Sequence, residues 1–480
     1  MNTSRSMWWF FVAGLLLAVH ANAAAEYTVT DLGTLGGNHA EANGLNNRGQ
    51  VVGWSLDADG RKQAFVWQNG RMTGLGFLPG GTSSVAMAIN NGGEITGYAH
   101  ISAANWRAFL YVSNSMINIG TWGSINSMGR AINDQGAISG TAPPTNNSSY
   151  NSSFYWQTNQ YTQIPAFAPG NSCDAYGINN LGQVCGITFV YSPNPRWWAY
   201  VWHDDNTNGL HDNGEMKLLG TFGIKDSVGE MSTANAINDH GLVVGWSAIS
   251  NWYYPRHAFL ITPSNGIWKL PSYNNTDPTN LLMRSLGTLG GPTNNSSANA
   301  LNNHGWIVGT SDTPAGTNQA FLWRNETMLN LNSLIPPDTG WVLTNATAIN
   351  DANEIAGNGL FNGEPRAFLL RREGRIHEFE SHVLHWSGIW STNINKTNVF
   401  TVEYSATLQP DSWQPAPPPP NGLLWIGSGQ TIFCRRPPHG FSASKLGRSP
   451  ASRRHQRTTK KPPGFRWEAD GIKHAKGYCT

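Results

Sequence analysis

The stretch SLGTLGGPTNNSSANALNNHGWIVGTS, residues Ser285–Ser311, contains two phrases that recur along the chain. The first, LGTLGG, also stands at Leu32–Gly37, and looser versions lie between the two copies. The second is an Ile-Asn or Leu-Asn pair followed by a turn, and it occurs seven times: LNNRG at Leu45, INNGG at Ile89, INDQG at Ile132, INNLG at Ile178, INDHG at Ile237, LNNHG at Leu301 and INDAN at Ile349. Successive copies are 43 to 64 residues apart, a spacing that is typical of repeat proteins.

Each copy of the second phrase has the composition of a tight turn. Asn stands first, Asn or Asp second and, outside the seventh copy, Gly fourth, which fits a type I turn closed by a left-handed residue. In the seventh copy Asn353 replaces the glycine, and Asn tolerates the left-handed conformation better than most residues. Strand-like runs such as VVGW and WIVG follow the turn, and their glycine predicts a close approach of another backbone.

An aromatic phrase, such as QAFVW or RAFLY, follows 18 to 21 residues after each turn. Its aromatic members are Phe65, Phe109, Phe154, Tyr200, Phe259, Phe321 and Phe368. A polar turn and another strand-like piece come next, so each unit holds four short β segments. Such a unit cannot bury both of its faces alone, but seven stacked units can. The pattern therefore predicts an all-β fold, a seven-bladed β-propeller in which LGTLGG links one blade to the next.

The repeated phrases resemble the HAF repeat, which is named for the His-Ala-Phe found intact at His257–Phe259. The resemblance extends from about Tyr27 to Glu373 and holds in order through all seven copies. It implies an extracellular bacterial repeat protein with a propeller-like fold, and it implies no catalytic residues. The segment Tyr27–Gly33 is an additional copy of a last strand, so we expect it to pair within the blade formed by Ala346–Glu373 and to close the ring.

The two ends of the chain differ from the repeats. Residues 1–23 read as a signal peptide, with Arg5, a 13-residue apolar run from Met7 and a small-x-small site at Ala21–Ala23. The propeller is expected over 24–375, a short β segment that resembles a truncated sandwich domain over 376–415, and a Pro-rich, basic and disordered tail over 416–480. Twelve of the 31 basic residues but two of the 29 acidic ones lie from Arg435 onward. The body is therefore acidic, and we expect no nucleic-acid partner and no transmembrane segment.

The segment DDNTNGLHDNGE, which begins at Asp204, has the spacing of a calcium-binding loop. Oxygen donors stand at the positions that an EF-hand-type loop uses, and a glycine stands at the sharp bend. The expected metal ligands are Asp204, Asn206, Asn208, Leu210 (by its carbonyl), Asp212 and Glu215. No helical pattern flanks the segment, so it predicts a free-standing structural calcium site. The alternative is an ordinary solvated Asn/Asp turn.

Aromatic clusters mark two of the insertions that lengthen the repeats. Candidate ligand-binding residues are Trp197, Trp198, Trp252, Tyr253 and Tyr254, because exposed rings stack on sugars and loops on rigid scaffolds carry binding sites. The alternative is that these rings pack between blades. Cys173 and Cys185 flank one predicted hairpin, which makes them a candidate disulfide in an oxidising compartment.

No nucleophile elbow, phosphate-binding glycine loop or His-rich zinc motif is found in the sequence, so no catalytic residue is assigned. We expect an exported, monomeric, non-catalytic protein that binds or scaffolds at the cell surface. A propeller that binds or processes carbohydrate through its aromatic loops is the second hypothesis. The fold does not decide between them, because one fold serves many functions.

Overall fold

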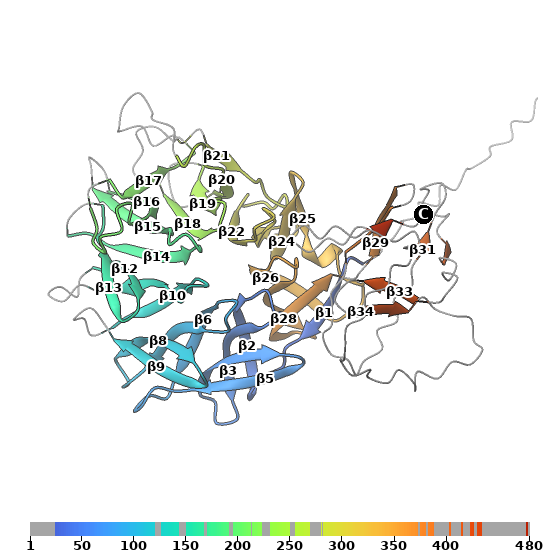
Figure 1. Ribbon diagram of the computed structural model, residues 1–480, viewed down its shortest axis with the longest axis horizontal. Helices are drawn as coiled ribbons and strands as arrows, with labels where there is room; N and C mark the ends of the chain where they lie inside the picture. The colour runs from blue at the N-terminus through green and yellow to red at the C-terminus, as the bar shows by residue number, and fades with distance from the viewer. Residues whose placement is uncertain are drawn as a thin grey trace, which may run out of the picture.

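The computed structural model describes residues 25–120, 126–143, 150–167, 170–191, 195–212, 214–222, 231–249, 255–268, 280 and 282–372, with short strands between 375 and 478. Seven four-stranded antiparallel sheets, the blades, follow one another around a ring (Figure 1). The only helix in the described part is a short 3-10 turn, η1 (Leu331–Ser333). The seven-bladed propeller predicted from the repeat is therefore confirmed.

The blades follow the sequence repeats, and their strands are named here in order from the channel outward. Blade 1 contains β2 (Gly36–Leu45), β3 (Val51–Asp57), β4 (Lys62–Gln68) and β5 (Arg71–Gly76); blade 2, β6 (Ser84–Ile89), β7 (Ile95–His100), β8 (Trp106–Val112) and β9 (Ser115–Gly120); blade 3, β10 (Met128–Ile132), β11 (Ile138–Ala142), β12 (Ser152–Gln157) and β13 (Gln160–Ile164); blade 4, β14 (Cys173–Ile178), β15 (Val184–Tyr191), β16 (Pro195–Trp202) and β17 (Met216–Gly220); blade 5, β18 (Ser232–Ile237), β19 (Val243–Ala248), β20 (Arg256–Ile261) and β21 (Met283–Ser285); blade 6, β22 (Ser296–Leu301), β23 (Ile307–Asp312), β24 (Asn318–Arg324) and β25 (Thr327–Asn330); blade 7, β26 (Trp341–Ile349), β27 (Ile355–Phe361), β28 (Glu364–Arg372) and β1 (Tyr27–Asp31).

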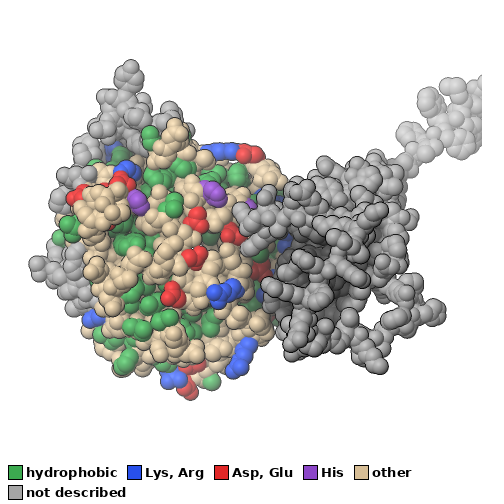
Figure 2. Space-filling view, viewed as in Figure 1, with side chains coloured by type: hydrophobic (Ala, Val, Ile, Leu, Met, Phe, Trp, Pro, Cys, Tyr) green, Lys and Arg blue, Asp and Glu red, His purple; other side chains and the backbone are tan. Residues whose placement is uncertain are grey.

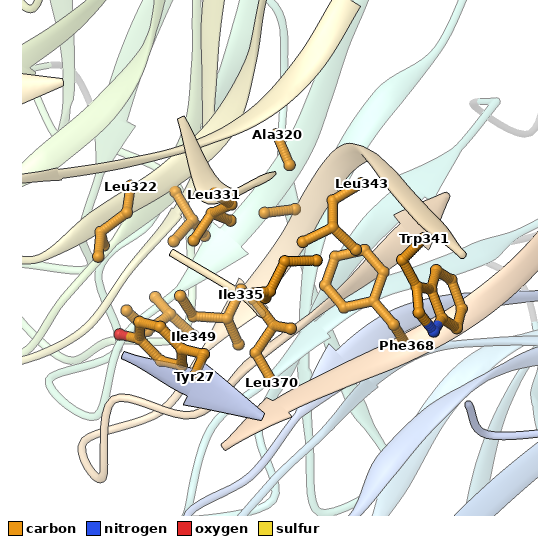
Figure 3. Close-up of a cluster of buried hydrophobic side chains, with 13 residues drawn as sticks. Tyr27, Ala320, Leu322, Leu331, Ile335, Trp341, Leu343, Ile349, Phe368 and Leu370 are labelled. Atoms are coloured by element: carbon orange, nitrogen blue, oxygen red, sulfur yellow. The ribbon is translucent and has the colours of Figure 1, made fainter. Parts of the chain in front are cut away.

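The N-terminal strand closes the ring. β1 pairs antiparallel with β28, from Tyr27 opposite Arg372 to Asp31 opposite Phe368, and Figure 1 shows the two strands side by side. The side chain of Tyr27 is fully buried in the cluster between blades 6 and 7, near Ile349 and Leu370 (Figure 3). The predicted closure is thus confirmed, and β28 does not end the sheet with an open edge.

The glycine of the second strand allows a tight crossing of backbones in every blade. In blade 6, a Cβ on Gly309 would lie 2.0 Å from the carbonyl oxygen of Ser297 and 2.9 Å from the ring of Phe321. The first strand carries a bulge next to this contact, between Ala298 and Ala300, and a bulge at the same place recurs in the other blades. Phe321 itself is fully buried. The close approach predicted from the VVGW-type runs is therefore confirmed.

The LGTLGG phrase forms the link between blades. Gly287 follows β21 with φ +75°, a conformation that favours glycine. Its carbonyl accepts a hydrogen bond of 2.6 Å from the hydroxyl of Ser296, the first residue of the next blade. The same hydroxyl accepts from the backbone N–H of Ala258 at 2.8 Å. One serine thereby joins the third strand and the exit of one blade to the entry of the next.

Short strands also occur after residue 372. β29 (Arg375–Glu380), β30 (Val383–Ser387) and β35 (Gly477–Tyr478) share one sheet, and two hairpins lie between them: β31 (Glu403–Tyr404) with β32 (Gln414–Pro415), and β33 (Leu423–Ile426) with β34 (Gln430–Phe433). The expected β segment over 376–415 and the disordered tail over 416–480 stay predictions. Among the described residues, no helix is long and apolar enough to span a bilayer.

Candidate binding face and calcium loop

The antiparallel topology gives the ring two different faces. The turn face carries the seven turns that join the first and second strands. The loop face carries the connections between second and third strands and the links between blades. The predicted insertions at 143–152, 188–196 and 251–256 fall at the ends of or between second and third strands in the sequence, and residues 144–149, 192–194 and 251–254 of them lie outside the described residues. That they share the loop face stays a prediction.

Seven asparagines form a hydrogen-bonded ring around the channel at the turn face. The side-chain Nδ2 of the first turn Asn donates to the backbone carbonyl of the first turn Asn in the next blade, at 2.9–3.1 Å. The circuit runs through Asn46, Asn90, Asn133, Asn179, Asn238, Asn302 and Asn350 and returns to Asn46. The Oδ1 of the same residue caps its own turn, as Asn238 does for the N–H groups of His240 and Leu242.

A second circuit lies beside the first. The backbone N–H of the second turn residue donates to the side-chain Oδ1 of its counterpart in the next blade at 2.8–3.1 Å. Its members are Asn47, Asn91, Asp134, Asn180, Asp239, Asn303 and Asp351. A polar hollow of about 220 Å³ lies among these turns. Each blade contributes the same turn to it, with Asn first and Asn or Asp second, so this end of the channel is nearly uniform around the ring.

The loop face varies from blade to blade. The residue three positions before the conserved aromatic of the third strand is Lys62, Trp106, Asn151, Trp197, Arg256, Asn318 or Pro365. Figure 2 shows one face of the molecule, on which charged and hydrophobic side chains are scattered in small groups among polar atoms; the variation of the loop face is seen from the seven residues named above.

The structure separates the aromatic residues that were predicted to bind ligand. Trp197 is partly exposed and lies edge-on to Phe189, with ring centroids 5.0 Å apart. Trp198 is buried, with 5% of its surface exposed, so its assignment to an exposed binding surface is wrong. Consecutive strand residues point to opposite faces of a sheet, and only one of the pair can face outward. Trp252, Tyr253 and Tyr254 lie outside the described residues.

The two cysteines are free thiols in the structure, which corrects the expected pairing. Cys173 and Cys185 belong to different hydrophobic clusters, and Cys173 lies opposite Thr188 rather than Cys185 in the β14–β15 pairing. In blade 4, Cys173 occupies the position that Ser296 holds in blade 6, the first residue of the first strand. Its Sγ accepts from the N–H of Ser153 at 3.2 Å and donates to the carbonyl of Ile164 at 3.1 Å. Burial raises the pKa of each thiol to about 12, so both stay protonated.

A cleft of about 530 Å³ opens on the loop face between blades 5 and 6. Blade 5 contributes Arg256, at the start of β20, to the lining of the cleft. Blade 6 contributes residues with hydroxyl and amide side chains, including Ser297, Thr310 and Asn318. Neighbouring His257 bonds through Nδ1 to the hydroxyl of Ser285 at 2.8 Å. Burial lowers the pKa of His257 in spite of the Asn294 hydrogen bond and the charge of Asp312, so this imidazole is neutral at neutral pH. Sequence analysis did not find the cleft, because Arg256 is separated in the sequence from the blade 6 wall, which runs from Thr293 to Asn318.

The predicted calcium loop connects β16 to β17 on the turn face. The Asp204 carboxylate accepts from the N–H groups of Asn208 and Gly209, at 3.2 and 2.8 Å. Glu215 is buried with 4% of its side chain exposed, and its two oxygens accept from the N–H groups of Asp205 and Asp212. The first and last acidic residues thus fold the segment into a loop.

The middle of this loop gathers around Asp212. One oxygen of its carboxylate accepts from the side-chain amides of Asn206 and Asn208, at 2.6 and 2.7 Å. These bonds, Asn206 first, hold the pKa of Asp212 below its usual value. The expected carbonyl donor, Leu210, has an exposed side chain and an N–H that bonds to Asn208. In the described residues, no group of three Asp, Glu, His or Cys side chains lies close enough to hold a metal ion. The predicted ligands are therefore neighbours, but their oxygens bond to one another's N–H groups.

Comparisons with known proteins give no activity for this chain. Residues 199–383 match a family described as a protein of unknown function (DUF3466), and no curated protein matches. TolB from Acinetobacter baumannii is 9% identical, with a TM-score of 0.33, over 50% of this chain and 53% of TolB. An acylaminoacyl peptidase from Pyrococcus horikoshii is 10% identical, with a TM-score of 0.40, over 74% of this chain and 58% of the peptidase. An Aleuria aurantia lectin variant in complex with Fucalpha1-6GlcNAc is 13% identical, with a TM-score of 0.32, over 62% of this chain and 96% of the lectin. The name HAF repeat stays a resemblance of sequence.

Proposed function

We propose that this protein is an exported, non-catalytic propeller that binds or scaffolds at the cell surface through its loop face. One observation carries the proposal: the two faces are built differently. On the turn face, every blade contributes the same groups to closed hydrogen-bond circuits. On the loop face, equivalent positions hold a cation, an aromatic ring, an amide or a proline. A rigid ring that varies on one side offers a surface whose side chains can be adapted to a ligand.

A glycan array combined with a hydrolase substrate panel tests this function with the chain lacking residues 1–23. Saturable binding without product release is the expected result, and turnover of any bound glycan overturns the non-catalytic reading. Trp197→Ala on the loop face should weaken binding. Leu181→Ala, an exposed residue at a turn of the same blade, is the matched control and should have no effect.

Carbohydrate processing is the second candidate function, and it is favoured only by the partly exposed Trp197 on the loop face. A ring of this size binds a sugar through its flat apolar surface. Processing would additionally require two carboxylates at the bound sugar. Product release in the substrate panel, lost in Trp197→Ala, is the result that would establish this candidate.

We further propose that the Asp204–Glu215 loop binds calcium in a structural role. Its five side-chain donors lie within one closed loop, and the amides of Asn206 and Asn208 meet at the Asp212 carboxylate. Rotation of these two amides would turn their oxygens toward the same point, and oxygen is the donor that Ca²⁺ prefers. The bound ion would stiffen the β16–β17 connection, and titration of the purified chain with Ca²⁺ tests the proposal.

A further inference from the structure

The first strand of each blade carries a bulge residue, and in blade 3 that residue is a cation. The bulge in β10 lies between Gly129 and Ala131 and places Arg130 there. A Cβ on Gly129 would lie 2.1 Å from Oγ1 of Thr96 in blade 2, so Gly129 faces blade 2. The guanidinium of Arg130 reaches the other neighbour, and its carbon lies 5.7 Å from the centre of the Tyr176 ring in blade 4. Since β10 and β14 are neighbouring first strands (Figure 1), Arg130 stands between blades 3 and 4 at the channel wall.

In four other blades the bulge residue bonds to the next blade. Its side chain donates to a backbone carbonyl in the first strand of that blade, at 2.7–3.0 Å. These residues are Asn43, Asn235, Asn299 and Thr347. Arg130 differs, because its buried Nε has no hydrogen-bond partner among the described residues. No ion pair joins it to a carboxylate in the described part of the chain either. Blade 3 thus has a cationic donor where other blades have an interblade hydrogen bond.

A second polar group of blade 3 also lacks the interblade bond of its equivalent. Thr141 pairs with Met128 of β10. Paired residues share one side of a sheet and successive residues alternate, so Thr141 lies opposite to the side of Gly129 and faces blade 4. Its Oγ1 is buried and has no partner within the described residues. The equivalent hydroxyl in blade 6, that of Thr310, donates to a carbonyl of blade 7 at 3.1 Å.

The contact with Tyr176 does not replace a hydrogen-bond partner for Arg130. An aromatic ring attracts the charge of a guanidinium, but the N–H groups still need acceptors, and a buried donor without one costs free energy, more so when it is charged. The side chain as a whole is half-buried, so solvent and solutes reach part of it. A guanidinium is always protonated in proteins. An anion with oxygen acceptors would therefore supply both the charge and the acceptors that this position lacks.

We propose that the inner junction of blades 3 and 4 binds an oxyanion, with Arg130 as its cation and the Thr141 hydroxyl as a further donor. The planar fork of Arg matches the oxygens of phosphate and carboxylate groups through parallel hydrogen bonds. The oxyanion is either a free ion or the end group of a larger ligand. The inference goes beyond the proposed function, because this site lies in the channel wall rather than on the loop face.

The test is calorimetric titration of the chain lacking residues 1–23 with inorganic phosphate, at an ionic strength held constant with chloride. We expect saturable binding. Arg130→Met, which copies Met87 of blade 2, should weaken it by about ten- to a hundredfold, as expected for loss of a charged hydrogen bond. Arg48→Gln removes the same charge from an exposed turn of blade 1 and should leave the affinity unchanged. Phosphate should also raise the melting temperature of wild type but not of Arg130→Met.

Parallel titrations with acetate and with glucose 6-phosphate identify the source of the oxyanion. Tighter binding of glucose 6-phosphate than of phosphate indicates the end group of a larger ligand, and equal binding indicates a free ion. Should Arg130→Met fold poorly, Arg130→Asn replaces it, because Asn is the bulge residue of blades 1, 5 and 6. Failure of all three anions to bind overturns the assignment. So does an affinity that is unchanged in the Arg130 variant, or one that falls equally in Arg48→Gln.

Discussion

At the scale of single residues, the side-chain amide of the first Asn in each turn makes two kinds of hydrogen bond, one as an acceptor and one as a donor. Its Oδ1 caps the local turn, and its Nδ2 donates to the next blade. Asp could cap the turn through Oδ1, but it has no N–H group to donate to the next blade. This explains why all seven copies have Asn at the first position. At the second position the circuit needs only Oδ1, which Asn and Asp both carry, and the side-chain amides of the Asn members donate to the neighbouring Asp carboxylates.

Asn238→Asp should therefore destabilise the ring more than Asp239→Asn does. The first change sets a carboxylate against the buried carbonyl of Asn302, with a loss on the order of 1–3 kcal/mol in the free energy of unfolding. The second change keeps the acceptor for the N–H of Asn180 but removes Oδ2, which accepts from the side-chain amides of Asn180 and Asn303, so its cost should stay near about 0.5–1 kcal/mol. Chemical denaturation of both variants measures the difference. Equal stability of the two would mean that the circuit adds nothing beyond the turns.

Glu26 is the other residue whose contacts give a clear prediction. Its oxygens accept from Arg324 at 2.5 and 2.6 Å, and Arg372 lies 2.9 Å away. Burial favours the neutral acid, but the hydrogen bonds and charges of Arg324 and Arg372 outweigh it and lower the pKa of Glu26 below 4.5.

A carboxyl group whose pKa is lower in the folded state stabilises the fold above its unfolded pKa, and this contribution is lost as the pH falls through the folded pKa. Wild type should therefore exceed Glu26→Gln in stability at about pH 7, and the gap should shrink as the pH falls below about 4.5. Thermal melts across this pH range measure it. A gap that stays constant with pH would show that the charge of Glu26 is irrelevant.

At the scale of strands and loops, the sequence predicts most of the structure because each signal is local. Turn residues and alternating apolar residues fix four strands per blade, and the VVGW-type glycine marks the crossing seen at Gly309. The partners across blades are not predictable in this way. The contact of Arg256 with Asn295 and the exchange of a linking serine for Cys173 depend on which strands become neighbours. The assignment of Trp198 to an exposed surface is wrong for a simpler reason. Trp198 directly follows Trp197 in β16, so its side chain lies on the opposite side of the sheet and is buried.

The calcium loop should bind its ion with modest affinity. It has no paired second loop, and Asn206 and Asn208 stand where a carboxylate is common, so we expect a Kd of roughly 10⁻⁴–10⁻³ M. At a calcium concentration near Kd the gain in stability is about 0.4 kcal/mol, so removal of the ion should loosen the loop without unfolding the ring. Calorimetric titration of wild type, Asp204→Ala and Glu215→Ala measures this. Equal heats in all three would identify an ordinary turn.

At the scale of the whole molecule, one strand decides whether the ring is closed. β1 supplies the last strand of blade 7, and Tyr27 fills the cluster between blades 6 and 7. Without it, β28 would present unpaired N–H and carbonyl groups along an edge, which is a template for association with another chain.

A chain that begins at residue 34 should therefore melt at a lower temperature and self-associate, whereas one that begins at residue 24 should remain a folded monomer. Size-exclusion chromatography with light scattering, together with thermal melts, separates the two. A monomeric, equally stable truncated chain would show that the closure by β1 is dispensable.

The same closure sets an order in time. Thr28 bonds to the backbone of Arg371, 343 residues further along the chain, so the first strand to be synthesised waits for the last blade. Every other blade is built from neighbours in sequence and can form as soon as its own hairpins exist. The entropy of joining distant ends grows only with the logarithm of the separation, so this wait delays folding more than it weakens the product. Closure consequently reports whether the last blade has been made: a chain interrupted before β28 leaves β1 without its partner strand, and only a chain that extends through residue 372 can form the complete β1–β28 pairing.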